Sequence, residues 1–226
     1  MKKVAIHQPN FIPWLGYFYK MKQCDTFIIL DDVLVSNSGS YFGQAFIKNS
    51  TNAALKISLP QKKHPQETLI KEVKFADNYP EWNKKFLKTL QNLYRKAPYF
   101  LTHYDNVVDL LGAKYNFVCE MNVALIRYCA QCLHLNCEII FASSLESKKQ
   151  KEARILDLVK KVGGAVYVSG MGAKNYQQEE DFVKENIKLL YSDFSITNYP
   201  QLYGDFVGGL SIIDFLFNTN GEGFCK

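Results

Sequence analysis

The first thirty-two residues constrain the fold most, because they alternate between strand, loop, helix and strand patterns. Residues 3–6 form a short apolar run that is typical of a buried strand. Pro9 and Pro13 exclude a helix interior and predict an extended loop. Residues 14–22 carry apolar side chains at helical spacing, and residues 26–30 form a second apolar run. This βαβ pattern predicts two parallel strands joined by a right-handed crossover.

The rest of the chain repeats this alternation around a helical middle. Apolar residues recur at helical spacing over residues 80–134, approximately, and strand patterns precede and follow this region. We therefore expect an α/β fold, with a mostly parallel sheet, flanking helices and a helical insertion, in a single domain over residues 1–226. The expected strands are residues 41–47, 53–60, 69–75, 137–144 and 165–168, and the further expected helices are residues 154–162 and 210–218.

Composition limits the environment and the partners. The chain has 226 residues, of which 47% are hydrophobic and 22% charged, as in an ordinary globular protein. Because it has no apolar run of about 18 residues and no apolar segment after its first lysines, we expect a cytoplasmic protein without membrane insertion. A formal charge of +5 is too small to predict nucleic-acid binding, but it suits an anionic nucleotide or an acidic carrier protein.

The sequence contains little that points to a metal site or to a known nucleophile motif. Cys129 and Cys132 form a Cys-x-x-Cys pair without a second pair, so helix packing is favoured over a zinc site and no metal is expected. The sequence has neither a Gly-x-Ser-x-Gly nor a His-Glu-x-x-His motif. His64, His103 and His134 are isolated, which favours surface or packing roles.

Polar side chains follow the first two expected strands directly. His7, Gln8 and Asn10 follow the first, and Asp31 and Asp32 follow the second. Ligands bind beyond the carboxyl ends of strands in parallel sheets, so this edge is the expected site. His7 is a candidate general base, and Asp32 is the aspartate expected to face the cleft and hold it. Bracing of a proline-rich turn and ordinary turn or cap roles are the alternatives.

A later strand end could bind an anion. Residues 169–176 combine two glycines with Lys174 and Asn175, and backbone N–H groups there could cradle a phosphate or carboxylate. A tight turn that needs positive φ would also explain the glycines.

Asp214 is the last notable residue, because it falls in an apolar, helix-like stretch. A buried carboxylate must be paired or hydrogen-bonded. Asp214 could therefore orient His7, or it could be a cap or structural partner, which is the favoured reading.

These residues together resemble one protein family, the WbqC-like family. The blocks that carry the resemblance are His7-Gln8-Pro9-Asn10-Phe11-Ile12-Pro13-Trp14-Leu15-Gly16-Tyr17-Phe18, Leu30-Asp31-Asp32-Val33, Tyr167-Val168-Ser169-Gly170 with Asn175-Tyr176, Tyr199-Pro200-Gln201, and Leu210-Ser211-Ile212-Ile213-Asp214. They span nearly the whole chain. The family is associated with bacterial O-antigen and capsule loci, and its members have been proposed to transfer glycine or another acyl group to an amino sugar.

The resemblance implies an N-acyl- or aminoacyltransferase that acts on a nucleotide-linked amino sugar for surface polysaccharide. One departure stands out. Where the family usually has Asn-Arg-Asn after the paired aspartates, this chain has Gly43-Gln44-Ala45. If that arginine binds an anionic group, this protein binds a different group or uses Lys48 instead.

We therefore expect direct attack of the sugar amine on an activated acyl donor, either a thioester on a carrier protein or coenzyme A or an aminoacyl donor, with no tightly bound cofactor. A homo-oligomer would be compatible with this reading. His7 and Asp32 are the expected catalytic residues. The expected substrate-binding residues are Gln8, Asn10, Trp14, Tyr17, Asp31, Tyr41, Gln44, Lys48, Ser169, Gly170, Lys174, Asn175, Tyr176, Gln201 and Asp214.

Two other functions remain open from the sequence. A nucleotidyltransferase-like enzyme would also have a strand followed by a histidine-containing loop, although the second histidine of a His-x-Gly-His pattern is missing. A non-catalytic module that binds a sugar or a carrier would bind its ligand without forming a product.

Overall fold

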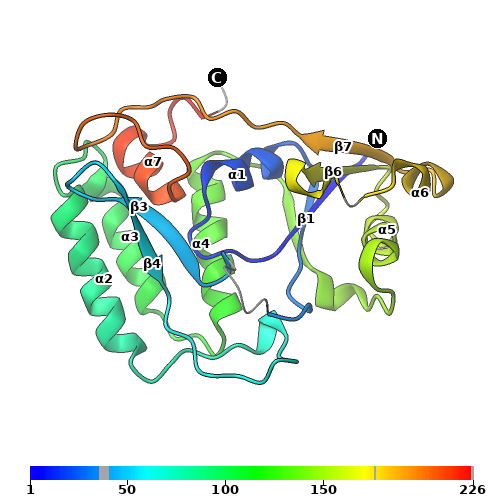
Figure 1. Cartoon of the computed structure of the whole chain (residues 1–226), viewed down its shortest axis with the longest axis horizontal. Coiled ribbons are helices and arrows are strands. Elements are labelled where there is room, and N and C mark those ends of the chain that lie inside the picture. The colour runs from blue at the N-terminus through cyan, green and yellow to red at the C-terminus, as the bar shows by residue number, and fades with distance from the viewer. Residues whose placement is uncertain (36–40, 176, 225–226) are drawn as a thin grey trace. The chain divides into compact units, whose positions relative to one another are not determined.

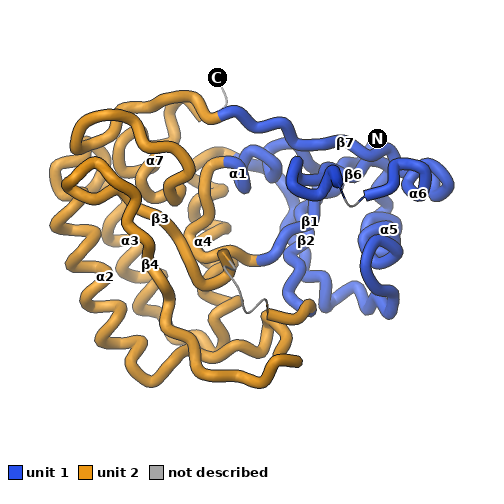
Figure 2. Tube along the Cα trace, in the orientation of Figure 1, with its two compact units in different colours: residues 1–8, 16–32, 135–195 blue, residues 9–15, 33–134, 196–226 orange. Residues whose placement is uncertain are grey.

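The computed structural model describes residues 1–35, 41–175 and 177–224, which form two compact units (Figure 2). Unit 1 comprises residues 1–8, 16–32 and 135–195, and unit 2 comprises residues 9–15, 33–134 and 196–226. The chain thus passes into unit 2 after Gln8 and returns to unit 1 at Gly16. That the two units fold as one domain stays a prediction.

Unit 1 is built on a parallel sheet (Figure 1). Its strands are β1 (Lys3–His7), β2 (Thr26–Ile29), β5 (Glu138–Phe141), β6 (Val166–Gly170) and β7 (Lys188–Ser192). Within the described residues their order is β5-β2-β1-β6-β7, and every neighbouring pair is parallel. This confirms the α/β fold and the βαβ unit predicted from the first thirty-two residues.

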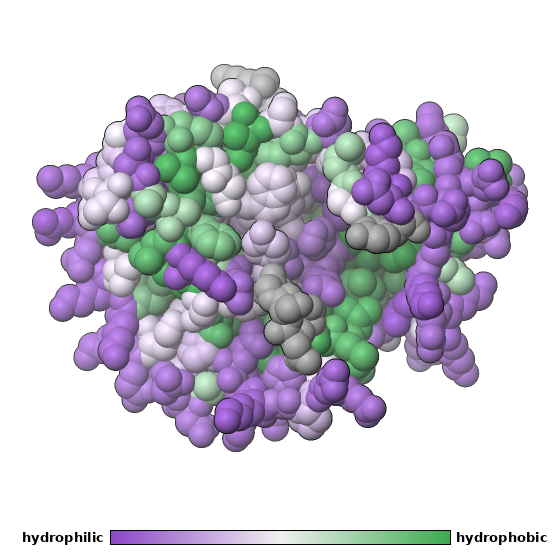
Figure 3. All heavy atoms as spheres, viewed as in Figure 1, coloured by the Kyte–Doolittle hydropathy of each residue, from purple (hydrophilic) through white to green (hydrophobic). Residues whose placement is uncertain are grey.

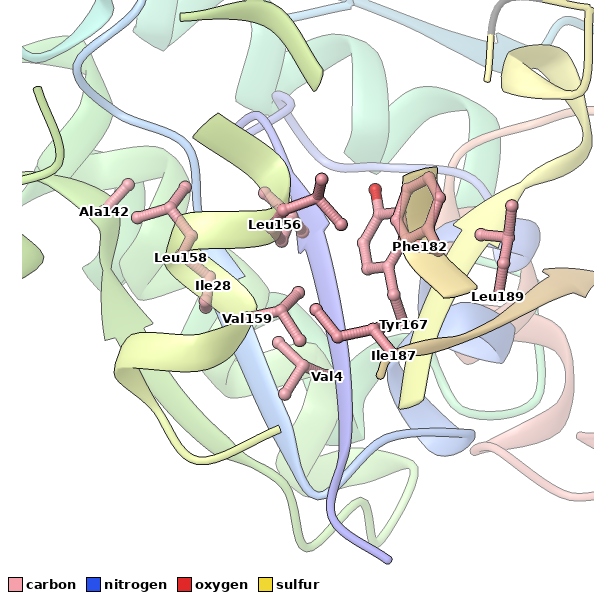
Figure 4. Packing of buried hydrophobic residues seen from close by; sticks show 11 residues of the cluster. Val4, Ile28, Ala142, Leu156, Leu158, Val159, Tyr167, Phe182, Ile187 and Leu189 are labelled. Carbon is pink, nitrogen blue, oxygen red and sulfur yellow. The ribbon is translucent and has the colours of Figure 1, made fainter. Parts of the chain in front are cut away.

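The helices of unit 1 cover both faces of this sheet. They are α1 (Leu15–Lys22, whose first residue belongs to unit 2), α5 (Lys151–Lys161) and α6 (Glu179–Lys184), and two short 3₁₀ helices, η2 (Ala142–Leu145) and η3 (Met171–Ala173), follow strand ends. Strand residues alternate between faces. Val4 therefore packs with Val159 of α5 on one face (Figure 4), while the ring of His7 lies 4.7 Å from that of Tyr17 of α1 on the other.

A glycine pair explains how α5 ends and packs. Gly163 has a φ of +70°, a conformation that stops the helix at little steric cost. A Cβ on Gly164 would lie 2.5 Å from Cγ2 of Val4 and 2.9 Å from the carbonyl oxygen of Val159. The glycine pair therefore lets the chain turn back closely against the central strand β1.

Unit 2 combines the helical middle of the chain with a hairpin. Strands β3 (Gln44–Lys48) and β4 (Ala54–Ser58) pair in antiparallel fashion. Helices α2 (Tyr79–Tyr94), α3 (Phe100–Gly112) and α4 (Val118–Cys132) form the predicted helical insertion, and α7 (Ile212–Thr219) is the predicted buried helix. Ser211 caps α7, since its side chain accepts a hydrogen bond from the Ile213 N–H.

One predicted strand is wrong. Residues 69–75 contain the short 3₁₀ helix η1 (Ile70–Glu72), and only the single bridges of Leu69 with Leu34 and of Phe75 with Gln61 remain of the expected strand. The buried residues of this segment are Ile70 and Val73, which are three positions apart. Their spacing suits a turn of helix, and this burial overrode the two-residue alternation of the sequence.

Candidate functional site

The centre of the unit 1 sheet opens at its carboxyl edge. Pairing between β1 and β6 ends at Ala5 and Val168. Beyond this point β1 continues along β2 to the His7–Ile29 pair, and β6 continues along β7 to the Gly170–Ser192 pair. The strand order also reverses here, because the chain builds outward from β1 first to β2 and β5 and later to β6 and β7. This is the switch point at which open α/β sheets bind ligands.

His7 ends β1 at this switch point. Its Nδ1 lies 3.2 Å from the carbonyl oxygen of Gln8. Because a carbonyl only accepts, Nδ1 carries the ring proton and Nε2 keeps a lone pair. Burial, together with the positive charge of Lys20, lowers the pKa of His7 from 6.5 to about 3. The imidazole is therefore neutral at pH 7.

Gln8 and Tyr17 support His7 from the backbone and from α1. The Tyr17 hydroxyl donates a 3.2 Å hydrogen bond to the carbonyl of Gln8, the same carbonyl that faces the His7 ring. Tyr17 is itself only 1% exposed. Its ring therefore serves to hold the His7–Gln8 turn rather than to present a surface to substrate.

Lys20 is a site residue that the sequence did not predict. It is 5% exposed, and its ammonium donates a 2.8 Å hydrogen bond to the carbonyl of Ile6. The His7 carbonyl accepts from Leu30 on the β2 side, so the Ile6 carbonyl points toward β6, where pairing has ended. Burial lowers the pKa of Lys20 to about 8. The feature of the sequence that could have identified Lys20 is its place on the apolar face of a short helix.

The two aspartates at the end of β2 are both engaged inside unit 1. Asp31 is 3% exposed and accepts hydrogen bonds from the Ser143 N–H (3.0 Å) and hydroxyl (2.6 Å). Asp32 forms an ion pair with Arg154 of α5, with 2.5 Å between Oδ2 and Nη2. The expectation that Asp32 holds His7 is therefore wrong, because its carboxylate is paired with a guanidinium instead.

The Asp32–Arg154 pair leaves buried polar atoms unsatisfied. Oδ1 of Asp32 and Nε of Arg154 have no hydrogen-bond partner in the described part of the chain. Both side chains are about 15% exposed, so these atoms lose most of their contact with water, which is costly unless another group satisfies them. Arg154 carried no signal in the sequence, because it pairs across 122 positions with a residue on another element.

The turn after β6 differs from the tight turn expected for its glycines. Ser169 is 1% exposed, and Gly170 leads into η3. Neither Gly170 nor Gly172 has positive φ, and a Cβ on either would meet no atom within 4 Å. Positive φ is therefore the wrong explanation. Lys174, with its Nζ 6.0 Å from the Tyr191 ring centroid, and Asn175 are exposed, and Tyr176 lies outside the described residues.

Three predicted site residues form a buried network within unit 2. Asp214 is 0% exposed and accepts hydrogen bonds from the Tyr94 and Tyr199 hydroxyls and from the Gln201 amide, at 2.7, 2.8 and 3.0 Å. Burial raises its pKa. The Lys48 ammonium donates to the Gln201 side chain and to the Asp205 carbonyl.

This network has a structural use. Lys48 is 0% exposed, and its ammonium is bonded to Gln201 and Asp205. Of the two alternatives for the missing arginine, this favours the binding of a different group over the use of Lys48. Both carboxylate oxygens of Asp214 accept hydrogen bonds from Tyr94, Tyr199 and Gln201. This favours the structural role of Asp214 over the orientation of His7. The sequence missed the network because its members lie on β3, α2, α7 and the preceding loop.

A second group of predicted residues lines one pocket of unit 2. Asn10, Trp14, Tyr41 and Gln44 border an open pocket with an empty volume of about 250 Å³. Its wall includes Ile12, a buried β-branched residue with a φ of +33°. Such a conformation costs about 1–3 kcal/mol and persists only where the surrounding structure enforces it. Strain of this kind concentrates at binding sites.

Two further candidates have packing roles inside unit 2. Cys129 is buried in α4. His103 has its Nδ1 2.7 Å from the Tyr128 hydroxyl and its Nε2 2.8 Å from the Asn220 side-chain oxygen, so it ties α3 to the end of α7. Among the described residues, no three histidine, cysteine or acidic side chains cluster as metal ligands do, and no helix is long and apolar enough to span a membrane.

Comparisons with known proteins agree with the resemblance seen in the sequence. The sequence model of the WbqC-like protein family matches residues 8–224. The chain is also 30% identical, over 233 aligned positions, to the uncharacterized protein Rv1507c of Mycobacterium tuberculosis. That alignment covers 98% of this chain and 96% of the relative. No solved structure matches the chain.

Proposed function

We propose that this chain, which belongs to the WbqC-like protein family, is an N-acyl- or aminoacyltransferase that modifies the amine of a nucleotide-linked amino sugar for surface polysaccharide. The observation that carries the proposal is the switch point of the parallel sheet, with a neutral imidazole at the end of its central strand. A parallel sheet of this order suits a nucleotide, and a neutral imidazole suits proton transfer.

The proposed reaction uses the lone pair of His7 Nε2. The sugar amine attacks the acyl carbonyl of a thioester on a carrier protein or coenzyme A, a C–N bond forms, and the C–S bond breaks. The amine nitrogen becomes strongly acidic once it has bonded to the carbonyl carbon, so even a weakly basic imidazole can take its proton. His7 then returns the proton to the departing thiolate. An aminoacyl donor would react in the same way through its own leaving group.

The other residues of unit 1 would bind rather than react. The exposed turn from Gly170 to Asn175 offers N–H groups and the Lys174 ammonium to an anionic part of the substrate. The Arg154 guanidinium has an Nε that no described residue satisfies and that a further acceptor could use. Lys20 places a second positive charge beside His7. A bound diphosphate near these cations would raise the pKa of His7 and make it a better proton acceptor.

The test is an acylation assay followed by mass spectrometry. Uridine- and thymidine-diphosphate amino sugars are incubated with acyl-coenzyme A, acyl-carrier and aminoacyl donors, and N-acylated product is measured. We expect product with the wild-type chain and with His64→Ala, a variant in the exposed connector of unit 2, and a loss of at least about 100-fold with His7→Ala. Near-wild-type turnover of His7→Ala would remove His7 from the mechanism, and lack of product with every donor would refute acyl transfer.

A nucleotidyltransferase-like activity is the second candidate, and the strand order β5-β2-β1-β6-β7 with a histidine at the end of the central strand favours it. This arrangement is common to nucleotide-binding sheets irrespective of the reaction. The two candidates differ in their products. Release of pyrophosphate from a nucleoside triphosphate, without any acyl donor, would support nucleotidyl transfer over acyl transfer.

A further inference from the structure

The pocket of unit 2 has a neutral lining. Among the described residues that border it are two amide side chains (Asn10 and Gln44), two exposed aromatic rings (Trp14 and Tyr41) and apolar residues, and none carries a full charge. A ligand without charge therefore suits this lining best.

The two amides provide hydrogen-bonding groups that no other described residue uses. Asn10 is 6% exposed, and neither its amide nor that of Gln44 makes a side-chain hydrogen bond with another described residue. Because both residues line the pocket, a ligand that offers both donors and acceptors would satisfy them.

The two aromatic rings provide flat apolar surface at the same pocket. Trp14 is 40% exposed and Tyr41 is 56% exposed, which is unusual for such large rings. Figure 3 shows hydrophobic and weakly polar side chains gathered over β3 and α7 on this face of unit 2, while hydrophilic ones line its rim along α2. The negative face of an aromatic ring attracts the slightly positive C–H groups of a saturated ring.

The loop that carries Asn10 and Trp14 is held in place before any ligand binds. The Asn122 amide donates to the carbonyls of Pro9 and Phe42, both at 2.8 Å. The Phe11 N–H donates to the Tyr41 carbonyl at 2.9 Å, and the Ile212 N–H donates to the Pro13 carbonyl at 2.7 Å. A pocket that is ordered in advance loses little conformational entropy on binding.

We propose that this pocket is a binding site for one uncharged pyranose ring, which stacks on Trp14 and Tyr41 and exchanges hydrogen bonds between its hydroxyls and the amides of Asn10 and Gln44. A pyranose has apolar C–H groups on its faces and hydroxyls around its rim, and this matches aromatic faces combined with amides. The half-exposed rings of Trp14 and Tyr41 suit a ligand that remains partly exposed to solvent when bound. The inference does not depend on the proposed acyl transfer, because its test measures binding alone.

The test is a ligand-observed saturation-transfer NMR titration of the full chain. The probes are methyl β-glucopyranoside, N-acetylglucosamine and uridine. We expect the two pyranoses to bind the wild-type chain, and Trp14→Ala to weaken them at least about tenfold, as loss of a stacking ring does. Trp14→Phe, which keeps a ring, should restore part of the affinity. Leu101→Ala, which removes an exposed apolar side chain of α3 outside the pocket, should bind as the wild type does.

Three results would overturn the proposal. Binding of uridine in preference to both pyranoses would assign the pocket to a nucleobase. Pyranose binding that Trp14→Ala leaves unchanged would place the sugar elsewhere, and absence of pyranose binding to the wild-type chain would exclude the site. Circular dichroism establishes that Trp14→Ala is folded. If it is not, Tyr41→Ala removes the second, more exposed ring and is judged by the same criteria.

Discussion

The ammonium of Lys20 binds the carbonyl of Ile6 at 2.8 Å, on the edge of β1 where pairing with β6 has ended. A buried cation thus occupies the place of the next sheet hydrogen bond and lies beside the His7 ring. Its charge contributes to the lowered pKa of His7, after burial. The same lysine therefore binds the open edge of β1 and lowers the pKa of His7, the candidate catalytic residue.

Removal of the Lys20 charge should raise the pKa of His7. Lys20→Met keeps most of the side-chain volume but loses the charge, while burial still acts, so the pKa should rise from about 3 and stay below 6.5. An NMR pH titration of the His7 ring measures this. Lys22→Met, on the exposed side of the same helix, should leave the titration unchanged. A His7 pKa that stays constant in Lys20→Met would show that burial alone sets it.

Acid should destabilise the chain through His7. The unfolded imidazole binds a proton near pH 6.5, whereas the folded one resists it until about pH 3, so the unfolded state holds more protons in this window and stability falls as the pH falls through it. The loss attributable to His7 between pH 7 and pH 5 is about 2 kcal/mol. Urea unfolding at both pH values measures it. The difference between them should shrink in His7→Gln and persist in His64→Ala, and an equal difference in all three proteins would contradict the assignment.

Loss of Arg154 should destabilise unit 1. Arg154→Met leaves the mostly buried Asp32 carboxylate without its cation, which costs about 3 kcal/mol in the free energy of unfolding. The double variant Asp32→Asn/Arg154→Met should lose less than the sum of the single variants, because it leaves no unpaired charge. Chemical denaturation of the wild type, the two single variants and the double variant gives the coupling energy.

The control for this cycle lies on the same helix. Lys160 of α5 pairs with Glu185 at an exposed position, so Lys160→Met should cost clearly less than Arg154→Met. Equal losses of unfolding free energy in Arg154→Met and Lys160→Met would mean that the Asp32–Arg154 pair stabilises the chain no more than an exposed ion pair does.

A positive charge at Gln44 should change which sugars unit 2 prefers. Gln44→Arg places a guanidinium at the rim of an otherwise neutral pocket. It should therefore increase the affinity for glucuronate by about tenfold relative to methyl β-glucopyranoside, as expected for a charge pair in a partly wet site. Competition NMR with the two sugars gives the ratio. Gln91→Arg, on the exposed face of α2, should leave the ratio unchanged, and an unaltered ratio in Gln44→Arg would count against the pocket.

The fold was predictable wherever the signal was local. The apolar runs of β1 and β2, separated by a proline-rich loop and a short helix, predicted the parallel pair correctly. The alternation over residues 69–75 predicted a strand, but the buried residues Ile70 and Val73 are three positions apart and form a turn of helix. A segment of only seven residues is too short for its sequence pattern to distinguish the two.

The candidate site was predictable only in part. The sequence placed His7 and both aspartates at one sheet edge, since the carboxyl ends of parallel strands lie together. It did not pair them correctly, because the partners Ser143 and Arg154 lie more than a hundred residues further along the chain. Lys48, Gln201 and Asp214 were interpreted as substrate-binding for the same reason, since only the tertiary structure shows that they bind one another.

Unit 1 consists of three separate chain segments, and this determines when its sheet can be completed during synthesis. The central strand β1 leaves the ribosome first, and β2 can join it after a short helix. Its other neighbour, β6, begins only at Val166, after the whole helical middle of the chain has been made. Until then one edge of the central strand remains open, and closing so long a loop is slow. Nascent chains of this protein should therefore depend on chaperones up to the emergence of β6, and become resistant to protease only beyond it.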